Sequence, residues 1–353
     1  MTEHSLVSRL NELFDQDYRD DQPGAVVVVL DNEHVLYQRC IGLANLEHQQ
    51  KITLDTNFRL ASLTKQLTAY GIALLEQQGR LSTTDTLDRF LPTAFRTRCP
   101  IVSTTVTIDH LLHHSSGIMD YEIGPIDAHE QWCDADVLDA VDDGTYFASG
   151  TQYRYSNTGY ILLGIIIEIA SAQSLEDFFR RHVFEPFGMR NSVLYGSEHT
   201  SIPDRALGYV KDETTDNYTL RDQSSTSATK GDGGIYMSLN DYLQWYRHCP
   251  PLPSSSIVPI TVKPSCDYYY SFGWFLSDTT GRMRSHIGDS CGFTHQVYRI
   301  DQEDRHLLVV YLSNIGNNHE RLSTFNQLLV ETLPSALSPT EYQLLQDMQT
   351  LTR

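Results

Sequence analysis

Basic residues are scarce in this sequence. Its 353 residues include 26 Lys and Arg against 45 Asp and Glu, which gives a formal net charge of −19 at pH 7. This balance disfavours nucleic acid and anionic membranes as partners, because their phosphates would be repelled. We expect neither partner, and we interpret the charge as a solvated acidic surface that keeps the protein in solution.

Long apolar runs and paired cysteines are also missing, and we expect no secretory leader. Residues 1–6 lack the basic start and apolar run of a secretory signal. The most apolar stretch, residues 160–170, is too short to cross a bilayer and carries Glu168. No Cys-x-x-Cys pair or zinc spacing occurs among Cys40, Cys99, Cys133, Cys249, Cys266 and Cys291. We therefore expect reduced thiols, a buried helix at 160–170, a cytoplasmic location, and neither metal nor cofactor.

The hydrophobic pattern changes twice along the chain. A helix is expected over 4–19 and a β-hairpin over 24–41. Further strands are expected at 268–276, 283–286, 293–300 and 306–313, with a final helix at 318–333. Helices at 62–78, 108–113 and 158–172 lie between them. Strands from both ends of the chain predict a discontinuous α/β sheet domain (1–80 and 265–353) with a mostly helical insert (81–264).

Ser62 and Lys65 form a Ser-x-x-Lys pattern at the start of an expected helix. Residues three apart share a helix face, so the Lys65 amine can reach the Ser62 hydroxyl. Serine becomes a good nucleophile when a neighbouring base takes its proton, and burial lowers a lysine pKa enough for that task. Free backbone N–H groups at the helix start would stabilise an oxyanion.

The same spacing occurs in Ser227 and Lys230. This second copy lies in the segment 224–234, which is rich in Ser, Thr and Gly and has no helical periodicity. The first copy is followed by an apolar helix pattern, so we assign the nucleophile to Ser62 and treat Ser227 and Lys230 as loop residues.

Two further motifs follow in order. In Tyr155-Ser156-Asn157, the Tyr155 phenol is suited to relay a proton, and the Asn157 amide to hold Lys65 or a substrate carbonyl. The alternative is a tyrosine-bearing loop with Asn157 as the N-cap of the next helix. In His286-Ile287-Gly288-Asp289, glycine would let substrate approach the strand, and the Asp289 N–H would join that of Ser62 in an oxyanion hole.

Together these motifs resemble the class C β-lactamase family and its esterase and peptidase relatives. Landmarks at 58–66, 77–81, 111–117, 184–189 and 233–238 extend the resemblance, which covers about residues 24–315. It implies a β-lactamase-like α/β (α+β) fold with an antiparallel sheet flanked by helices. It also implies acyl transfer through an acyl-enzyme on Ser62, with Lys65 and Tyr155 moving the proton. Asn157, His286, Gly288 and Asp289 would bind substrate or the oxyanion.

The last motif departs from the Lys-Thr-Gly of true class C β-lactamases. His286 and Ile287 stand where those enzymes have the lysine and the threonine that help bind a carboxylate, and Asp289 adds negative charge. These changes favour an esterase, amidase or peptidase that acts on a neutral or cationic small molecule. If His286 must be neutral, activity should decline as the pH falls through about 6.5.

Several alternatives remain open. The chain could be a true β-lactamase, a D-Ala-D-Ala carboxypeptidase, or a silent penicillin-binding sensor. His110, His113 and His114 could form a metal site, although a structural role is favoured because no carboxylate or cysteine pattern completes them. The sequence does not predict the oligomeric state, the natural substrate, or which of Lys65 and Tyr155 is the principal base.

Overall fold

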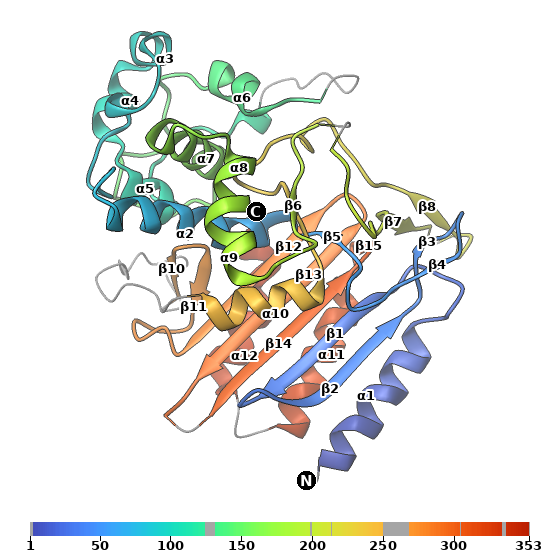
Figure 1. Ribbon diagram of the computed structural model, residues 1–353. Helices are drawn as coiled ribbons and strands as arrows, with labels where there is room; N and C mark the ends of the chain where they lie inside the picture. Colours follow the sequence, from blue (N-terminus) through green and yellow to red (C-terminus); the bar gives the residue numbers. More distant parts are fainter. Residues whose placement is uncertain are drawn as a thin grey trace.

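A central antiparallel sheet organises the molecule (Figure 1). The computed structural model describes residues 3–123, 131–197, 200–212, 214–249, 268–303, 305–333 and 337–352. Cys266 and Pro334 lie outside these ranges. The seven strands run in the order β10-β11-β12-β13-β14-β1-β2. Their bounds are β1 (Ala25–Asp31), β2 (His34–Ile41), β10 (Tyr269–Ser271), β11 (Trp274–Leu276), β12 (Met283–Ser290), β13 (Phe293–Asp301) and β14 (His306–Ser313).

The two ends of the chain meet within this sheet. β1 pairs with β14 from Ala25–Ser313 to Asp31–Leu307 and with β2 on its other side. Its first six residues are fully buried, as expected for a Val-rich strand covered on both faces. The expected hairpin over 24–41 is confirmed, and both turn residues, Asn32 and Glu33, have positive φ.

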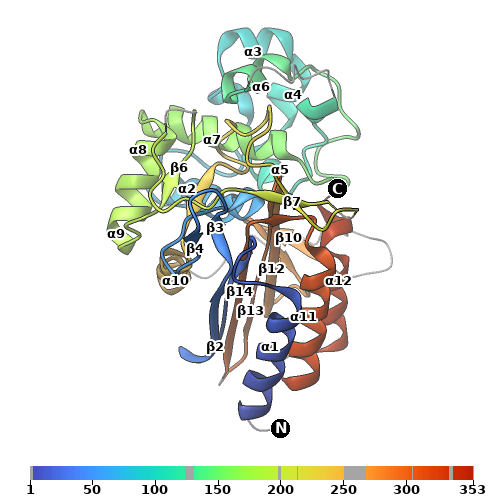
Figure 2. The ribbon, with the colours of Figure 1, turned by 90° about the vertical axis from the view of Figure 1, so that its right-hand side faces the viewer.

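Three helices cover one face of the sheet (Figure 2): α1 (Glu3–Asp17), α11 (His319–Thr332) and α12 (Pro339–Leu351). The sequence analysis predicted α1 and α11 but missed α12. Ser338 caps α12 through a capping box with Glu341, a signal that was present in the sequence.

The remaining helices lie over the opposite face and one end of the sheet. They are α2 (Thr64–Gln77), α3 (Thr93–Arg98), α4 (Pro100–Thr105), α5 (Ile108–Leu112), α6 (Asp134–Ala140), α7 (Asn157–Ser171), α8 (Leu175–Phe179), α9 (Glu185–Phe187) and α10 (Leu239–His248). Shorter helical turns are η1 (Ala61–Leu63), η2 (Leu87–Arg89), η3 (Tyr121–Ile123) and η4 (Arg180–Phe184). The core helix expected at 160–170 is confirmed within α7, where Tyr160–Leu163 are fully buried.

Small sheets complete the fold. They contain β3 (Leu43–Asn45) with β4 (Gln50–Lys51), then β5 (Phe58–Arg59), β6 (Val193–Leu194) and β9 (Ile235–Met237), and lastly β7 (Tyr209–Lys211), β8 (Tyr218–Leu220) and β15 (Ile315–Gly316). The fold class is as expected. The domain boundaries at 80 and 265 stay a prediction.

One expected strand is instead a hairpin. The run 268–276 is divided into β10 and β11 by Phe272 and Gly273, which have φ of 48° and 80°. A Cβ on Gly273 would lie 2.6 Å from the backbone of Gln66. Glycine therefore lets this hairpin pack directly against the start of α2, next to Lys65.

Candidate active site

Ser62 lies in a tight turn between β5 and α2. The sequence analysis placed it in the first turn of an α-helix, but residues 61–63 form the 3₁₀ turn η1, and α2 begins at Thr64. Ala61, directly before the serine, has φ of 48°, a left-handed conformation that costs energy for a residue with a side chain. Ser62 is partly exposed at the N-terminal end of α2.

Lys65 is completely buried beneath this turn. Its Nζ donates to Ser62 Oγ (3.1 Å), to Asn157 Oδ1 (2.8 Å) and to the carbonyl oxygen of Asp232 (3.0 Å). Burial lowers the pKa of Lys65 to about 8, although the charges of Asp232 and Glu122 oppose the shift. About one tenth of Lys65 is thus neutral at pH 7, and about half at pH 8, and this neutral form can take a proton.

Asn157 is the first residue of α7, not its N-cap. The cap is Ser156, whose Oγ accepts from the Gly159 N–H (3.1 Å). Capping by Ser156 leaves the Asn157 side chain available for Lys65. The pairing joins residues 92 positions apart.

Tyr155 is buried, with its ring beside Lys65. The Lys65 Nζ lies 4.9 Å from the ring centroid. Burial raises the pKa of Tyr155 well above 10, and a contact with Ser62 opposes the shift. The phenol is therefore neutral, and its hydroxyl has no hydrogen-bond partner of good geometry within the described part of the chain.

His286 lies in β12, and its ring faces that of Tyr155. It donates from Nδ1 to the carbonyl oxygen of Ile287 (2.6 Å), so Nε2 accepts from the Tyr270 hydroxyl (3.2 Å). Burial, then the charge of Lys65, lowers the pKa of His286 to about 3. The expected loss of activity through pH 6.5 is wrong for this residue, because it stays neutral far below that pH.

Gly288 and Asp289 are neighbours in β12, so their Cβ positions lie on opposite faces of the strand. A Cβ on Gly288 would lie 2.3 Å from the carbonyl oxygen of Leu60, so glycine is needed for packing against the turn that carries Ser62. The sequence analysis had assigned this space to substrate. The Asp289 carboxylate accepts from Thr294 Oγ1 (3.1 Å) and lies 3.0 Å from His319 Nε2. Its charge thus has partners in the protein, and only its backbone N–H stays a candidate oxyanion donor.

A cavity of about 90 Å³ opens above Ser62. Its lining comprises Arg59, Ala61, Ser62, Glu122, Asn157, Thr226, Thr229, Asp232, Gly233, Asp289 and Ser290. Larger hollows of about 410 and 780 Å³ lie away from Ser62, against Asp17 and Arg321 and against Arg284 and Asp301.

A sequence model of known proteins matches this chain over residues 10–332, and its description is "Beta-lactamase". The chain belongs to the beta-lactamase family. This membership agrees with the order of the three motifs and with the sheet and helix layers described above.

Three curated relatives show how varied this family is. The chain is 30% identical to penicillin-binding protein 4* of Bacillus subtilis, over 86% of this chain and 71% of that protein. It is 31% identical to esterase EstB of Burkholderia gladioli (65% and 61%) and 28% identical to a D-aminopeptidase of Gluconobacter oxydans (83% and 56%). The chain thus spans less than two thirds of the esterase and the D-aminopeptidase.

A solved structure has the same fold. The octameric penicillin-binding protein homologue of Pyrococcus abyssi superposes with a TM-score of 0.72 at 24% identity, over 99% of this chain and 81% of that one.

This beta-lactamase-family chain holds its second Ser-x-x-Lys copy in a turn. Ser227 is buried and accepts from the Ser224 N–H (2.9 Å). Lys230 points elsewhere, with its Nζ 2.9 Å from Glu168 and 3.5 Å from Glu176. The structure brings Ser62 and Lys65 together and keeps Ser227 and Lys230 apart.

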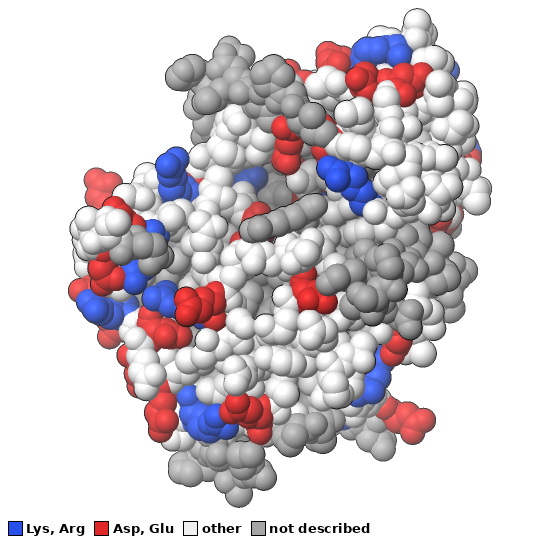
Figure 3. All heavy atoms as spheres, turned by 180° about the vertical axis from the view of Figure 1, so that it is seen from behind, with Lys and Arg blue, Asp and Glu red and all other residues white. Residues whose placement is uncertain are grey.

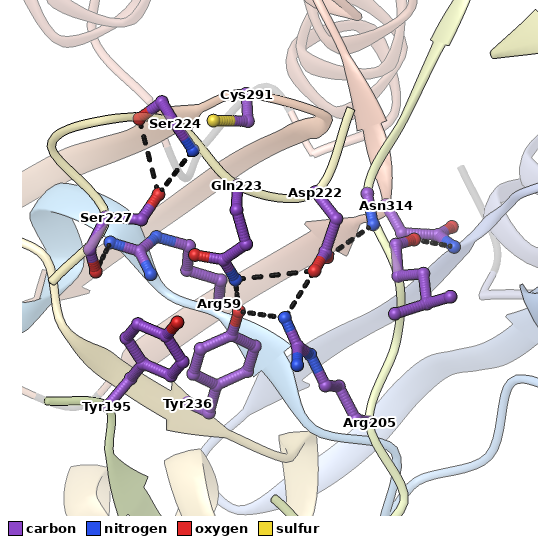
Figure 4. A network of polar contacts seen from close by, with 12 residues as sticks. Arg59, Tyr195, Arg205, Asp222, Gln223, Ser224, Ser227, Tyr236, Cys291 and Asn314 are labelled. Atoms are coloured by element: carbon purple, nitrogen blue, oxygen red, sulfur yellow. Dashed lines mark hydrogen bonds and ion pairs between the residues drawn. The ribbon is translucent and has the colours of Figure 1, made fainter. Parts of the chain in front are cut away.

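Arg59 anchors the wall of the cavity (Figure 4). It donates to the carbonyl oxygen of Ser227 (2.9 Å) and lies over the Tyr236 ring, 5.9 Å from the centroid. Arg205 donates to the Tyr236 hydroxyl (3.2 Å) and pairs with Asp222. This network joins β5, which leads into the turn that carries Ser62, to the segment that carries Ser227.

Sequence reasoning missed two acidic residues of the cavity, Glu122 and Asp232. Asp232 is 8% exposed, and its Oδ1 has no hydrogen-bond partner among the described residues. Glu122 is exposed as a whole residue, yet desolvation of its carboxyl group, then the charges of Asp232 and Asp120, raise its pKa. A signal existed for Asp232, since it lies between glycines in 231–234.

The three histidines of the 110–114 segment have separate partners. His110 takes part in the N-terminal capping box of α5, and His113 contacts the Asp109 carbonyl oxygen (2.8 Å). His114 accepts from the Ser156 N–H (3.1 Å). Within the described ranges, no group of three or more His, Cys, Asp or Glu side chains could hold a metal ion.

Charge on the surface is mixed. Figure 3 shows the face opposite to that of Figure 1, where acidic and basic side chains are interspersed and much of the surface is uncharged. The exclusion of nucleic acid as a partner stays a prediction from net charge. No single described helix has the length and apolarity to cross a membrane; only Asn157–Ser171 with Leu175–Phe187, bent by 77°, passes that test as a pair.

Proposed function

We propose that this chain is a serine hydrolase that works through an acyl-enzyme on Ser62. The observation that carries the proposal is the contact of 3.1 Å between Ser62 Oγ and a buried Lys65 amine whose pKa is lowered to about 8. An uncharged amine at hydrogen-bond distance is what a serine nucleophile requires.

In the first half-reaction, Ser62 Oγ bonds to the substrate carbonyl carbon. Its proton passes to the Lys65–Tyr155 pair. The Ser62 and Asp289 N–H groups hold the oxyanion. When the bond to the leaving group breaks, the pair returns the proton to the leaving oxygen or nitrogen. Lys65 has the pKa nearer to neutrality, which favours it as the acceptor, although a coupled pair titrates as a unit.

In the second half-reaction, water attacks the Ser62 ester. The same pair takes the water proton and returns a proton to Ser62 Oγ as the acid is released. Asn157 Oδ1 accepts from Lys65 Nζ (2.8 Å) and so holds the amine in position.

We infer that the substrate is an ester, amide or peptide with a neutral or cationic acyl group. His286 is neutral where true class C β-lactamases have a lysine, and Ile287 has no hydroxyl for a carboxylate. Glu122 and Asp232 also line the cavity. The names of the esterase and D-aminopeptidase relatives support the same substrate class. Kinship to class C enzymes in particular, and the cytoplasmic location, stay proposals.

The proposal is tested with p-nitrophenyl acetate and butyrate beside nitrocefin. We expect Ser62→Ala to lower ester turnover by at least about 10³-fold, because removal of a nucleophile leaves only binding and oxyanion stabilisation. Ser227→Ala is the matched control and should retain turnover. If Ser227→Ala loses ester turnover and Ser62→Ala keeps it, the assignment of Ser62 as the nucleophile is wrong.

Nitrocefin separates the alternatives. Efficient turnover of nitrocefin would identify a β-lactamase and refute the inference that the acyl group is neutral or cationic. Stoichiometric labelling of Ser62 without release, seen by intact-mass analysis, would identify a sensor.

A further inference from the structure

His114 occupies an unusual place beside the catalytic tyrosine. It follows the end of α5 and has φ of 56°, a left-handed conformation in which His is more common than most residues. It is 1% exposed. The mechanism proposed above gives it no role, and the sequence analysis considered it only as a metal ligand or structural residue.

Its backbone and its ring bind the chain on both sides of Tyr155. The His114 carbonyl oxygen accepts from the Arg154 N–H (2.9 Å), and His114 Nδ1 accepts from the Ser156 N–H (3.1 Å). His114 therefore accepts hydrogen bonds from the backbone N–H groups of the two residues that flank the tyrosine, Arg154 and Ser156.

The His114 ring also packs on Tyr155 itself. The two ring centroids are 4.4 Å apart, and the Tyr270 ring lies 4.3 Å from the histidine. Tyr270 in turn bonds to His286. Because Nδ1 accepts from Ser156, the ring proton of the neutral form is on Nε2, which is buried without a hydrogen-bond partner in the described ranges.

We propose that His114 is a positioning residue that sets the orientation of Tyr155 toward Ser62. The Tyr155 hydroxyl has no other hydrogen bond of good geometry to hold it, so its place depends on the backbone at 154–156 and on ring packing. This inference rests on the proposed function, because it assigns Tyr155 to proton transfer at Ser62.

Neutrality of His114 suits this role. Burial, then the charge of Lys65, holds the pKa of His114 well below 6.5. A neutral ring adds no second cation beside Lys65, and Nδ1 stays free to accept from Ser156 throughout the pH range of activity.

Three substitutions separate the two contacts. His114→Asn keeps an acceptor near the position of Nδ1 and tolerates positive φ, but it lacks the ring. His114→Phe keeps a ring without an acceptor, and His114→Ala removes both. His113→Asn is the matched control, because His113 is equally buried yet contacts Asp109 and Phe272 instead of Tyr155.

The experiment measures the rate of Ser62 modification by a fluorophosphonate probe, together with kcat and KM for p-nitrophenyl butyrate and the melting temperature. We expect His114→Ala and His114→Phe to slow acylation about 100-fold with KM little changed, as for a displacement of about 1 Å in a catalytic group. His114→Asn should recover most of the rate, and His113→Asn should keep it even where its melting temperature falls.

The inference is overturned if folded His114→Phe keeps the wild-type rate. It is also overturned if His113→Asn slows acylation as much as His114→Phe, or if His114→Asn is no faster than His114→Phe. If His114→Ala does not fold, the Asn and Phe variants decide. Failure of the proposed function is distinct, since Ser62→Ala would then react with the probe and ester at the wild-type rate.

Discussion

At the scale of single residues, the chemistry of this site depends on which groups burial leaves uncharged. Lys65 and His286 are both completely buried and about equally removed from water, yet only the lysine pKa falls near neutrality. The histidine stays neutral at any pH well above 3. Of these two residues, only the lysine changes charge near neutral pH.

The pH dependence of acylation should therefore follow Lys65. Protonated Lys65 cannot accept the Ser62 proton, so kcat/KM should fall as the pH drops through about 8. No inflection near 6.5 should arise from His286, and His286→Gln should keep the same profile. The measurement is kcat/KM for p-nitrophenyl butyrate from pH 5 to 9.5, corrected for spontaneous hydrolysis.

Lys65→Arg provides the control for charge. A guanidinium does not lose its proton in proteins, so this variant should be inactive across the whole range. A wild-type profile with its midpoint near 6.5 that disappears in His286→Gln would contradict this assignment.

At the scale of elements, the site depends on one contact, in which β12 packs against η1, the turn that carries Ser62. Beyond Ser285, β12 has no pairing with β11, and this edge instead packs against η1. Gly288 permits the contact with Leu60, and Gly273 permits that of the β10–β11 hairpin with α2. Close approach of backbones, not substrate access, explains both glycines.

Gly288→Ala should disturb this contact. The added Cβ would lie 2.3 Å from the Leu60 carbonyl oxygen, so either β12 or η1 must move. We expect a loss of about 1–3 kcal/mol in the free energy of unfolding and slower modification of Ser62. Urea denaturation and fluorophosphonate labelling measure the two effects.

Gly233→Ala is the stability control. Its Cβ would lie 3.7 Å from Ala61, an ordinary contact in the same neighbourhood. Equal destabilisation by both substitutions would show that the close contact of Gly288 with Leu60 is not the cause.

At the scale of the whole molecule, the helical middle of the chain is joined to the site by buried charge. Lys230 lies beside Glu168 of α7, and its backbone N–H donates to Asp134 of α6 (2.9 Å). Burial raises the pKa of Asp134 to about 7, with the charge of Lys230 opposing the shift. Removing the lysine would leave these carboxylates without their cation.

Lys230→Met should therefore destabilise the fold in a pH-dependent way. Asp134 has a folded pKa above its unfolded value, so it favours the folded state at low pH, and that stabilisation is lost as the pH rises toward 7. We expect a loss of about 1–3 kcal/mol at pH 8 and a smaller loss at pH 5, where Asp134 is protonated. Urea denaturation at both pH values tests this, with exposed Lys51→Met as the control. An equal loss at both values would contradict the role of Asp134.

How much could be predicted from the sequence differs among these scales. The helix after Ser62, the 24–41 hairpin and strands β12–β14 follow from hydrophobic periodicity and turn residues, which act locally. The Ser62–Lys65 pair follows from a spacing of three on one helix face. The Lys65–Asn157 contact was one of three roles expected for Asn157, beside holding a substrate carbonyl and capping α7. The structure shows this contact, and Ser156 caps α7 instead.

The sequence by itself determined the order of the motifs and most of the main secondary structure, and it predicted Ser62 instead of Ser227 as the nucleophile. Only the tertiary structure decided that His286 stays neutral, that the Asp289 carboxylate pairs with His319, that Gly288 packs on Leu60, and that His114 holds both sides of Tyr155. The physical reason is that pKa shifts and close backbone contacts depend on burial by distant segments. Local patterns carry no information about which segments those are.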